Sequence, residues 1–270
     1  MLRRIRLFGF CMLCALILWA GDRIKPLAAS FMITKTNVDE VIIDDQVFKM
    51  VLQGAEQNQT VLFSAWYSAN YADMKRVEIE RIIVSDLLPA LRVMGYDDLC
   101  VQLYNKHQGQ VDKYMQGVID EETLIHTVAF LEETCGIETL KLARAFDFKV
   151  WAIDPTYLYE GNRLLVFFHL MAGRIDGMLF ERLKRKIFNK DADAKVVCIL
   201  AGPYISEAPS LSVYPLGMRL NDFTNGRNFS VSIEGSEYPN KKIVSDIKIR
   251  IEGNIFYEAK GASLHPHQHD

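Results

Sequence analysis

Polar side chains gather at the carboxyl ends of four predicted strands, which is where a ligand would be contacted. The candidate ligand-binding residues are Tyr67, Asn70, Gln102, Tyr104, Asp154 and Tyr204. Phenol and amide groups dominate this set, and they donate and accept hydrogen bonds. Acids and bases are few, since only His107 and Asp154 titrate usefully near neutral pH without a large shift in pKa. The residue types therefore favour binding over catalysis.

Catalysis is the alternative, and its candidates are His107, Asp154 and Arg163. Arg163 begins the helical pattern that follows Asp154, close enough in sequence to pair with it. A serine hydrolase is disfavoured, because neither Ser64 nor Ser206 lies in a Gly-x-Ser-x-Gly turn. Asp154 also has a plain structural interpretation, since an Asp-Pro pair often begins a turn after a strand.

A metal site has support only in the C-terminal tail. His265, His267 and His269 alternate there, and alternate imidazoles can bind a divalent ion. The other interpretation of this segment is a disordered terminus.

The cysteines argue against a disulfide framework and against a zinc site. Beyond residue 30 the chain has Cys100, Cys135 and Cys198, an odd number without Cys-x-x-Cys spacing. Cys100 and Cys198 fall in predicted buried strands, where a free cysteine is a small hydrophobic residue. One disulfide stays open in an oxidising compartment, and the spacing does not choose its partners.

Short apolar segments that alternate with helical patterns predict the elements that position these residues. The strands are expected at residues 60–64, 98–104, 148–153 and 195–200. The helices are expected at residues 73–94, 108–116, 120–134, 137–146 and 162–189. This alternation predicts an α/β fold, a mostly parallel sheet flanked by helices and followed by a β-rich C-terminal extension. In such a sheet ligands bind at the carboxyl ends of the strands.

The chain divides into four predicted parts. They are residues 1–30, 31–220, 221–262 and 263–270. The first has three arginines before a short apolar run, which is typical of a secretory signal, with an uncleaved membrane anchor as the alternative. The second is the α/β domain, the third a β-rich extension with antiparallel strands at 229–234 and 247–251, and the fourth a histidine-rich tail. We expect an exported protein, periplasmic or anchored to the cytoplasmic membrane and facing the periplasm.

The charge balance disfavours nucleic acid as a partner. The chain has 34 acidic and 31 basic side chains, a net charge of −3 at pH 7. Binding to phosphates requires a clustered basic surface instead. The expected partners are a small-molecule ligand and, if residues 1–30 stay attached, the membrane. The sequence does not indicate an oligomeric state.

The order of these segments resembles the ChaN/Tiki/erythromycin-esterase-like superfamily, which includes haem-binding uptake proteins, membrane-anchored metalloproteases and esterases. The segments that carry the resemblance are residues 64–67, 102–104, 111–117, Arg163 with Met171-Ala172, and residues 201–204. Together they cover about residues 60 to 220.

The departures from the family pattern indicate lost chemistry. Ala65 and Tyr67 stand where the family has a glutamate and a histidine, and Gln102 replaces a second glutamate. Tyr204 or Ile205 stands at the last histidine. Alanine carries no proton, and glutamine neither acts as a base nor balances the charge of a metal.

The resemblance therefore implies a non-catalytic pseudoenzyme that binds haem or an iron complex, since tyrosinate can ligate ferric haem. The alternatives are a hydrolase of the same superfamily with relocated catalytic groups, and a structural or interaction protein of the cell envelope.

Overall fold

The computed structural model describes part of the chain, and several candidate residues lie outside it. The described residues are 45–64, 87–128, 131, 136–156, 165, 169, 172–200, 202–209, 212–235, 245–252 and 255–259. The candidates outside these ranges are Tyr67, Asn70, Arg163, His265, His267 and His269, together with Cys135, the N-terminal segment 1–30 and the tail 263–270. Among the described residues, no helix is both long enough and apolar enough to span a membrane.

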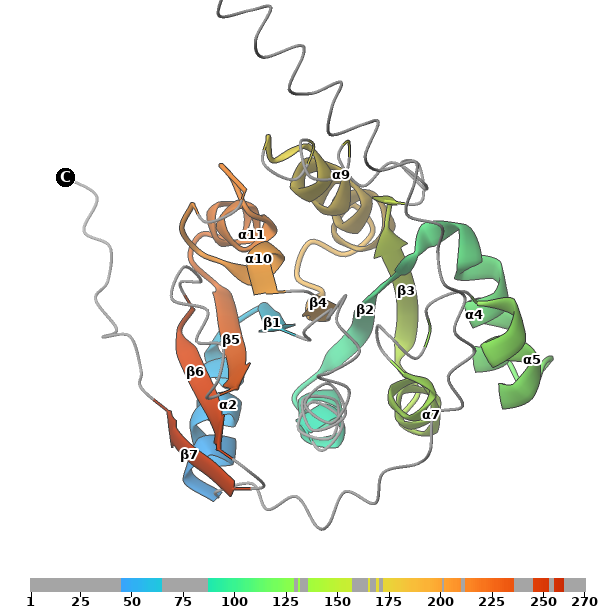
Figure 1. Ribbon diagram of the computed structural model, residues 1–270, viewed down its shortest axis with the longest axis horizontal. Helices are drawn as coiled ribbons and strands as arrows, with labels where there is room; N and C mark the ends of the chain where they lie inside the picture. Colours follow the sequence, from blue (N-terminus) through green and yellow to red (C-terminus); the bar gives the residue numbers. More distant parts are fainter. Residues whose placement is uncertain are drawn as a thin grey trace, which may run out of the picture. The chain divides into compact units, whose positions relative to one another are not determined.

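Seven strands of the described chain form one sheet (Figure 1). They are β1 (Thr60–Ser64), β2 (Tyr96–Tyr104), β3 (Lys149–Asp154), β4 (Lys195–Leu200), β5 (Asn228–Gly235), β6 (Ile247–Glu252) and β7 (Ile255–Ala259). Their order is β3-β2-β4-β1-β5-β6-β7, and every neighbouring pair is parallel except β6 with β7. The predicted α/β fold with a mostly parallel sheet is confirmed.

The expected antiparallel pairing of strands 229–234 and 247–251 is wrong. β5 pairs parallel with β1 on one side and parallel with β6 on the other, so it belongs to the main sheet. The alternation of polar and apolar residues in β5 suggested a strand with one face in water. Its polar residues Asn228, Ser230 and Ser232 are instead buried under helices.

Helices flank the sheet on both faces. They are α2 (Asp45–Gln57), residues 87–93, the 3₁₀ turn η2 (Asn105–His107), α4 (Gln108–Met115), α5 (Glu121–Thr127), α7 (Ile137–Ala145), α9 (Arg174–Leu183), the π-helical turn η4 (Lys184–Phe188), α10 (Gly202–Ile205) and α11 (Leu216–Phe223). Gly117, with a φ of 76°, ends the α4 region as predicted, because glycine adopts the left-handed conformation that closes a helix without a steric cost. Of the predicted helix 162–189, the structure describes a continuous helical stretch over residues 174–188.

Alternate residues of each strand build two apolar cores, one on each face of the sheet. One core holds Val61, Val101 and Val197 and packs against α2, residues 87–91, α4, α5 and α7. The other holds Leu62 and Cys100 and packs against α9, η4, α10 and α11. Cys100 and Cys198 are opposite one another in β2 and β4, and both are buried free cysteines as predicted.

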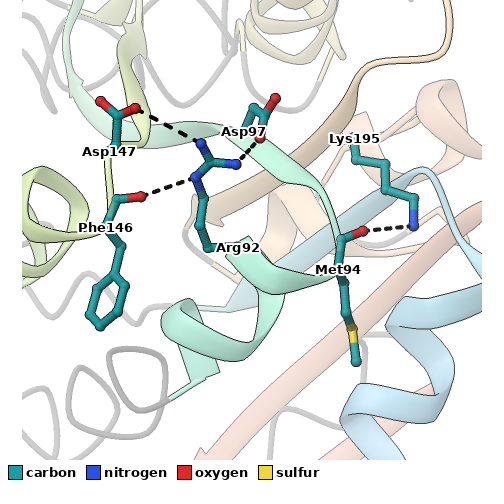
Figure 2. A network of polar contacts seen from close by, with 6 residues as sticks. All are labelled: Arg92, Met94, Asp97, Phe146, Asp147 and Lys195. Atoms are coloured by element: carbon teal, nitrogen blue, oxygen red, sulfur yellow. Dashed lines mark hydrogen bonds and ion pairs between the residues drawn. The ribbon is translucent and has the colours of Figure 1, made fainter.

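A network of polar contacts joins the amino ends of the central strands (Figure 2). The Arg92 guanidinium ion-pairs with Asp97 of β2 and approaches Asp147 at 4.0 Å, while its Nε donates to the Phe146 carbonyl at 3.0 Å. Beside it, Lys195 Nζ at the start of β4 donates to the Met94 carbonyl at 3.2 Å. This network fixes the connections that enter β2, β3 and β4.

The outer edge of β3 is occupied by side chains. The Gln108 amide accepts from Ala152 N at 2.7 Å and donates to the Val150 carbonyl at 2.9 Å, which copies the pairing of a neighbouring strand. Arg182 Nε donates to the Ala152 carbonyl at 3.1 Å. Backbone groups that an edge strand would present to other chains are thereby satisfied.

Candidate functional site

Side chains from three strand ends meet at the carboxyl edge of the sheet. Asp154 is the last residue of β3 and is 6% exposed, and its carboxylate accepts from Thr156 N at 2.7 Å. The side chains of Gln102, near the end of β2, and Thr156 also hydrogen-bond this carboxylate. Tyr204, in the short helix after β4, is close enough to Asp154 for the two groups to interact electrostatically. The structure therefore brings together Gln102, Asp154 and Tyr204, which the sequence placed at three separate strand ends.

An irregularity in β2 helps to position Gln102. Val101 pairs with Ala152 and Tyr104 with Asp154, so β2 has one more residue than β3 over this stretch. An extra residue in one strand bends the backbone and redirects nearby side chains. The irregularity lies between Val101 and Tyr104, a stretch that includes Gln102, the residue that reaches Asp154.

Burial sets the protonation of Asp154. Loss of water around the carboxyl raises its pKa, and the hydrogen bonds from Thr156 and Gln102 oppose that rise. The groups that act on Asp154 are hydrogen-bond donors, so its oxygens are engaged as acceptors. This carboxyl is held in place by hydrogen-bond donors of the protein.

Tyr204 is a neutral hydroxyl in this cluster. It is 7% exposed, and burial, followed by the nearby carboxyls of Asp154 and Asp176, raises its pKa well above the usual value. Both effects disfavour a phenolate. Tyr204 therefore acts as a hydrogen-bonding phenol.

Asp176 is a fourth member of the cluster that the sequence analysis did not single out. It lies in the first turn of α9 with 0% exposure, and its Oδ1 accepts from Leu216 N at 2.9 Å at the start of α11. Burial raises its pKa to about 6, against hydrogen bonds from Ser212 and Leu216 and the charge of Arg219. A signal for it existed, because Asp176 shares helical spacing with the apolar positions Leu179 and Leu183.

Tyr104 and His107 form the more accessible rim of the site. Both are half-buried, and their rings are stacked with centroids 6.3 Å apart and planes 13° apart. The Lys106 ammonium lies 5.2 Å from the centroid of the Tyr104 ring. The 3₁₀ turn that follows β2 creates this arrangement, since it returns His107 to the side of Tyr104. The two rings offer flat aromatic surface at the end of β2.

The described residues give limited support to a metal or haem-iron site. Among them, no group of three or more His, Cys, Asp or Glu side chains could hold a metal ion. Without a metal, burial and the nearby carboxyls keep the Tyr204 phenol protonated. The other candidate tyrosine that the structure describes is Tyr104, and its ring is stacked with that of His107.

Comparison with known proteins finds solved structures that resemble this chain, but it does not assign the chain to a family. No family model matches the chain, and no curated protein matches it by sequence. Among solved structures, ChaN of Campylobacter jejuni, described with cofacial haem binding, is 12% identical with a TM-score of 0.46, over 81% of this chain and 93% of that one. RRSP, a MARTX toxin effector domain from Vibrio vulnificus, is 13% identical with a TM-score of 0.48, over 74% of this chain and 37% of that one.

A structure titled bacterial protein toxins is 14% identical with a TM-score of 0.45, over 74% of this chain and 40% of that one. The chain thus spans less than half the length of these toxin chains. The superfamily suggested by the sequence motifs stays a prediction.

Proposed function

We propose that the chain is an exported, non-catalytic binding protein that takes a small ligand at the carboxyl edge of its sheet. The observation that carries this proposal is the convergence of Gln102, Asp154 and Tyr204 from three strand ends. Ligands of open parallel sheets bind at this edge, where a few polar groups fix their orientation.

The contacts of the site support binding over hydrolysis. A general base must reach the proton that it removes, and its partner usually orients it. Asp154 is engaged by Gln102 and Thr156, whereas the His107 ring stacks on Tyr104. Gln102 itself cannot take up a proton near neutral pH.

The class of ligand follows from the rim of the site, formed by Tyr104 and His107, and from its floor, formed by Gln102, Asp154 and Tyr204. The stacked rings of Tyr104 and His107 suit a planar group, since aromatic surfaces stack with an offset. The floor adds the hydroxyl of Tyr204 and the amide of Gln102 as hydrogen-bonding groups. Haem, which the family resemblance implies, is the planar probe to test first, with its contacts to the rim rather than to Tyr204.

Titration of the purified full-length chain with haemin tests the proposal, read by the Soret band and by quenching of tryptophan fluorescence. We expect saturable binding that Tyr104→Ala weakens about tenfold, as the loss of one aromatic contact predicts. Tyr204→Phe should leave the Soret position unchanged if haem contacts the rim, and a shift of the band would show that Tyr204 ligates the iron.

Phe146→Ala is the matched control, since it removes a partly exposed aromatic ring at the opposite, amino edge of the sheet. It should bind haemin as the unchanged chain does. Equal weakening by Phe146→Ala and Tyr104→Ala, or no saturable binding at all, would contradict a planar ligand at this rim.

A further inference from the structure

A second pair of acidic side chains, half-buried, lies beside β5 and takes no part in the proposed ligand site. Glu207 follows α10, and Asp246 comes directly before β6. Glu207 is bound by Asn228 and Asp246 by Ser230, two residues that lie on the same face of β5, so the two carboxyl groups lie beside one another. A hydrogen bond between two carboxyl groups requires a proton on one of them.

Polar side chains of β5 hold the two carboxyl groups in position. Asn228 Nδ2 donates to Glu207 Oε1 at 2.9 Å, and the oxygen of the same amide accepts from Thr60 Oγ1 of β1 at 2.6 Å. Asp246 Oδ2 accepts from Ser230 N at 2.7 Å, while Asp246 N donates to Ser230 Oγ at 3.2 Å. The pair is therefore anchored to the sheet from both sides.

We propose that Glu207 and Asp246 form a proton-operated latch that fastens the segment after α10 to the start of β6. With the proton present, one carboxyl group donates to the other and the latch is closed. When the proton leaves, two negative charges face each other in a largely buried place, and their repulsion opens the latch.

The surroundings of the pair agree with this assignment. Burial and the charge of Asp246 raise the pKa of Glu207 to about 8, and the hydrogen bonds from Ser230 and Asn228 oppose the rise. Burial also raises the pKa of Asp246, while Ser230 and Glu207 oppose it. Among the described groups that face the pair, Ser230 and Asn228 of β5 and Thr60 of β1 are uncharged. The pair titrates as a unit, and its upper step lies near pH 8.

Opening of the latch affects β6 first. In the described part of the chain β6 pairs with β5 and β7, and its first residue, Ile247, pairs with Val231 next to Ser230. Release of Asp246 removes the contact that aligns the start of this pairing. The sheet edge formed by β6 and β7 then opens locally, as less stable parts of a native protein do.

Hydrogen exchange of the full-length chain at a series of pH values tests the latch. We expect the protection factors of the β6 amides, which correct for the intrinsic pH dependence of exchange, to fall about tenfold for each pH unit between about pH 5 and pH 8 and to level off above pH 8, because the opened latch loses its proton near the ordinary pKa of glutamate, 4.5. Glu207→Gln keeps a side-chain donor for Asp246 but carries no titrating proton, so its protection should stay level through pH 9. Glu138→Gln removes an exposed carboxylate on α7 and should behave like the unchanged chain.

Equal pH profiles for Glu207→Gln and the unchanged chain would overturn the latch. A second measurement does not depend on a variant that folds. The carboxyl carbon of Glu207, followed by NMR in the unchanged protein, should titrate with a midpoint near pH 8, and a midpoint near the ordinary value for glutamate would refute the shared proton.

Discussion

The polar side chains at the two ends of strands β2, β3 and β4 differ in burial and in charge. At the amino ends of β2 and β4, Arg92, Asp97 and Lys195 pair charges with charges or with backbone carbonyls, and Asp97 is about half exposed. At the carboxyl ends, Asp154 and Tyr204 are buried and their pKa values are raised. The amino end thus carries a surface ionic network together with one buried carboxyl, Asp98, which is 7% exposed and accepts from Trp151 Nε1 at 2.7 Å, whereas the carboxyl end carries a buried, largely neutral cluster.

This difference helps to distinguish polar groups that serve the fold from polar groups that could serve a function. Surface ion pairs cost little to keep and contribute little to stability, so the Arg92 network needs no explanation beyond chain connection. Burying a carboxyl group costs free energy unless hydrogen bonds compensate. Polar clusters that are kept in spite of that cost mark candidate functional sites. The contrast makes the carboxyl edge the place to search for function.

The largest expected effect comes from adding a methyl group at Gly217, where α11 packs closely against the end of α10. A Cβ atom on Gly217 would lie 2.3 Å from the Ile205 carbonyl oxygen and 2.6 Å from that of Ser206, so Gly217→Ala must displace the backbone after α10. We expect a loss of about 3 kcal/mol in unfolding free energy, measured by urea denaturation. Gly109→Ala in α4 meets nothing within 4 Å and should stabilise by about 0.5–1 kcal/mol. Equal changes in unfolding free energy for the two variants would show that the backbone at Ile205 and Ser206 moves at no cost to accept the added methyl group.

A pH effect of about 1–3 kcal/mol is expected from Asp176. Its pKa rises from 3.8 to about 6 in the folded chain, so the folded state binds the proton more tightly than the unfolded state. This contribution to stability is complete below about pH 3.8 and is lost as the pH rises to about 6. Asp176→Asn should remove that slope when urea midpoints are compared between pH 3.5 and 7. Parallel curves for the two proteins would refute the raised pKa.

At the amino edge, Arg92→Ala should cost about 1–2 kcal/mol. Most of the loss is expected from the hydrogen bond to the Phe146 carbonyl, because the contacts to Asp97 and Asp147 are accessible to water. Haemin binding should not change. Arg185→Ala, which removes a hydrogen bond within one helix, is the control and should change stability by less than about 0.5 kcal/mol. Loss of binding by Arg92→Ala would remove the distinction between the two edges.

The smallest effect on stability is expected from Asp154→Asn. The amide oxygen still accepts from Thr156 N, and the cost of burying a carboxyl disappears, so unfolding free energy should change by less than about 1 kcal/mol at pH 7. The affinity for haemin should change more than the stability does. The reverse result, a strongly destabilised chain with unchanged binding, would make Asp154 a structural residue.

The sequence predicted the parallel core well because local patterns determine it. Strands 60–64 and 195–200 have the predicted bounds, since continuous apolar runs identify strands that are buried on both faces. The direction of β5 was not predictable in this way, because Asn228 and Ser230 look like solvent-facing residues until α10 and Glu207 are placed beside them.

The site was predicted in part for a similar reason. Gln102, Asp154 and Tyr204 follow from the rule for strand ends, and the structure brings them together. Asp176 had a local signal in its helical spacing with Leu179 and Leu183, whereas Glu207 depends on contacts between segments distant in sequence, which no local pattern encodes. Tyr67, Asn70, Arg163 and the tail histidines lie outside the described residues and stay predictions.

The Gln108 amide has a consequence for how this sequence can vary. One segment of seven residues, Gln102–Gln108, carries both the rim of the site and the cap on the β3 edge. Exposed strand edges promote aggregation, so a chain that lost Gln108 would tend to self-associate through β3. A change in the length of this segment would therefore alter the aromatic rim and the cap on the β3 edge together.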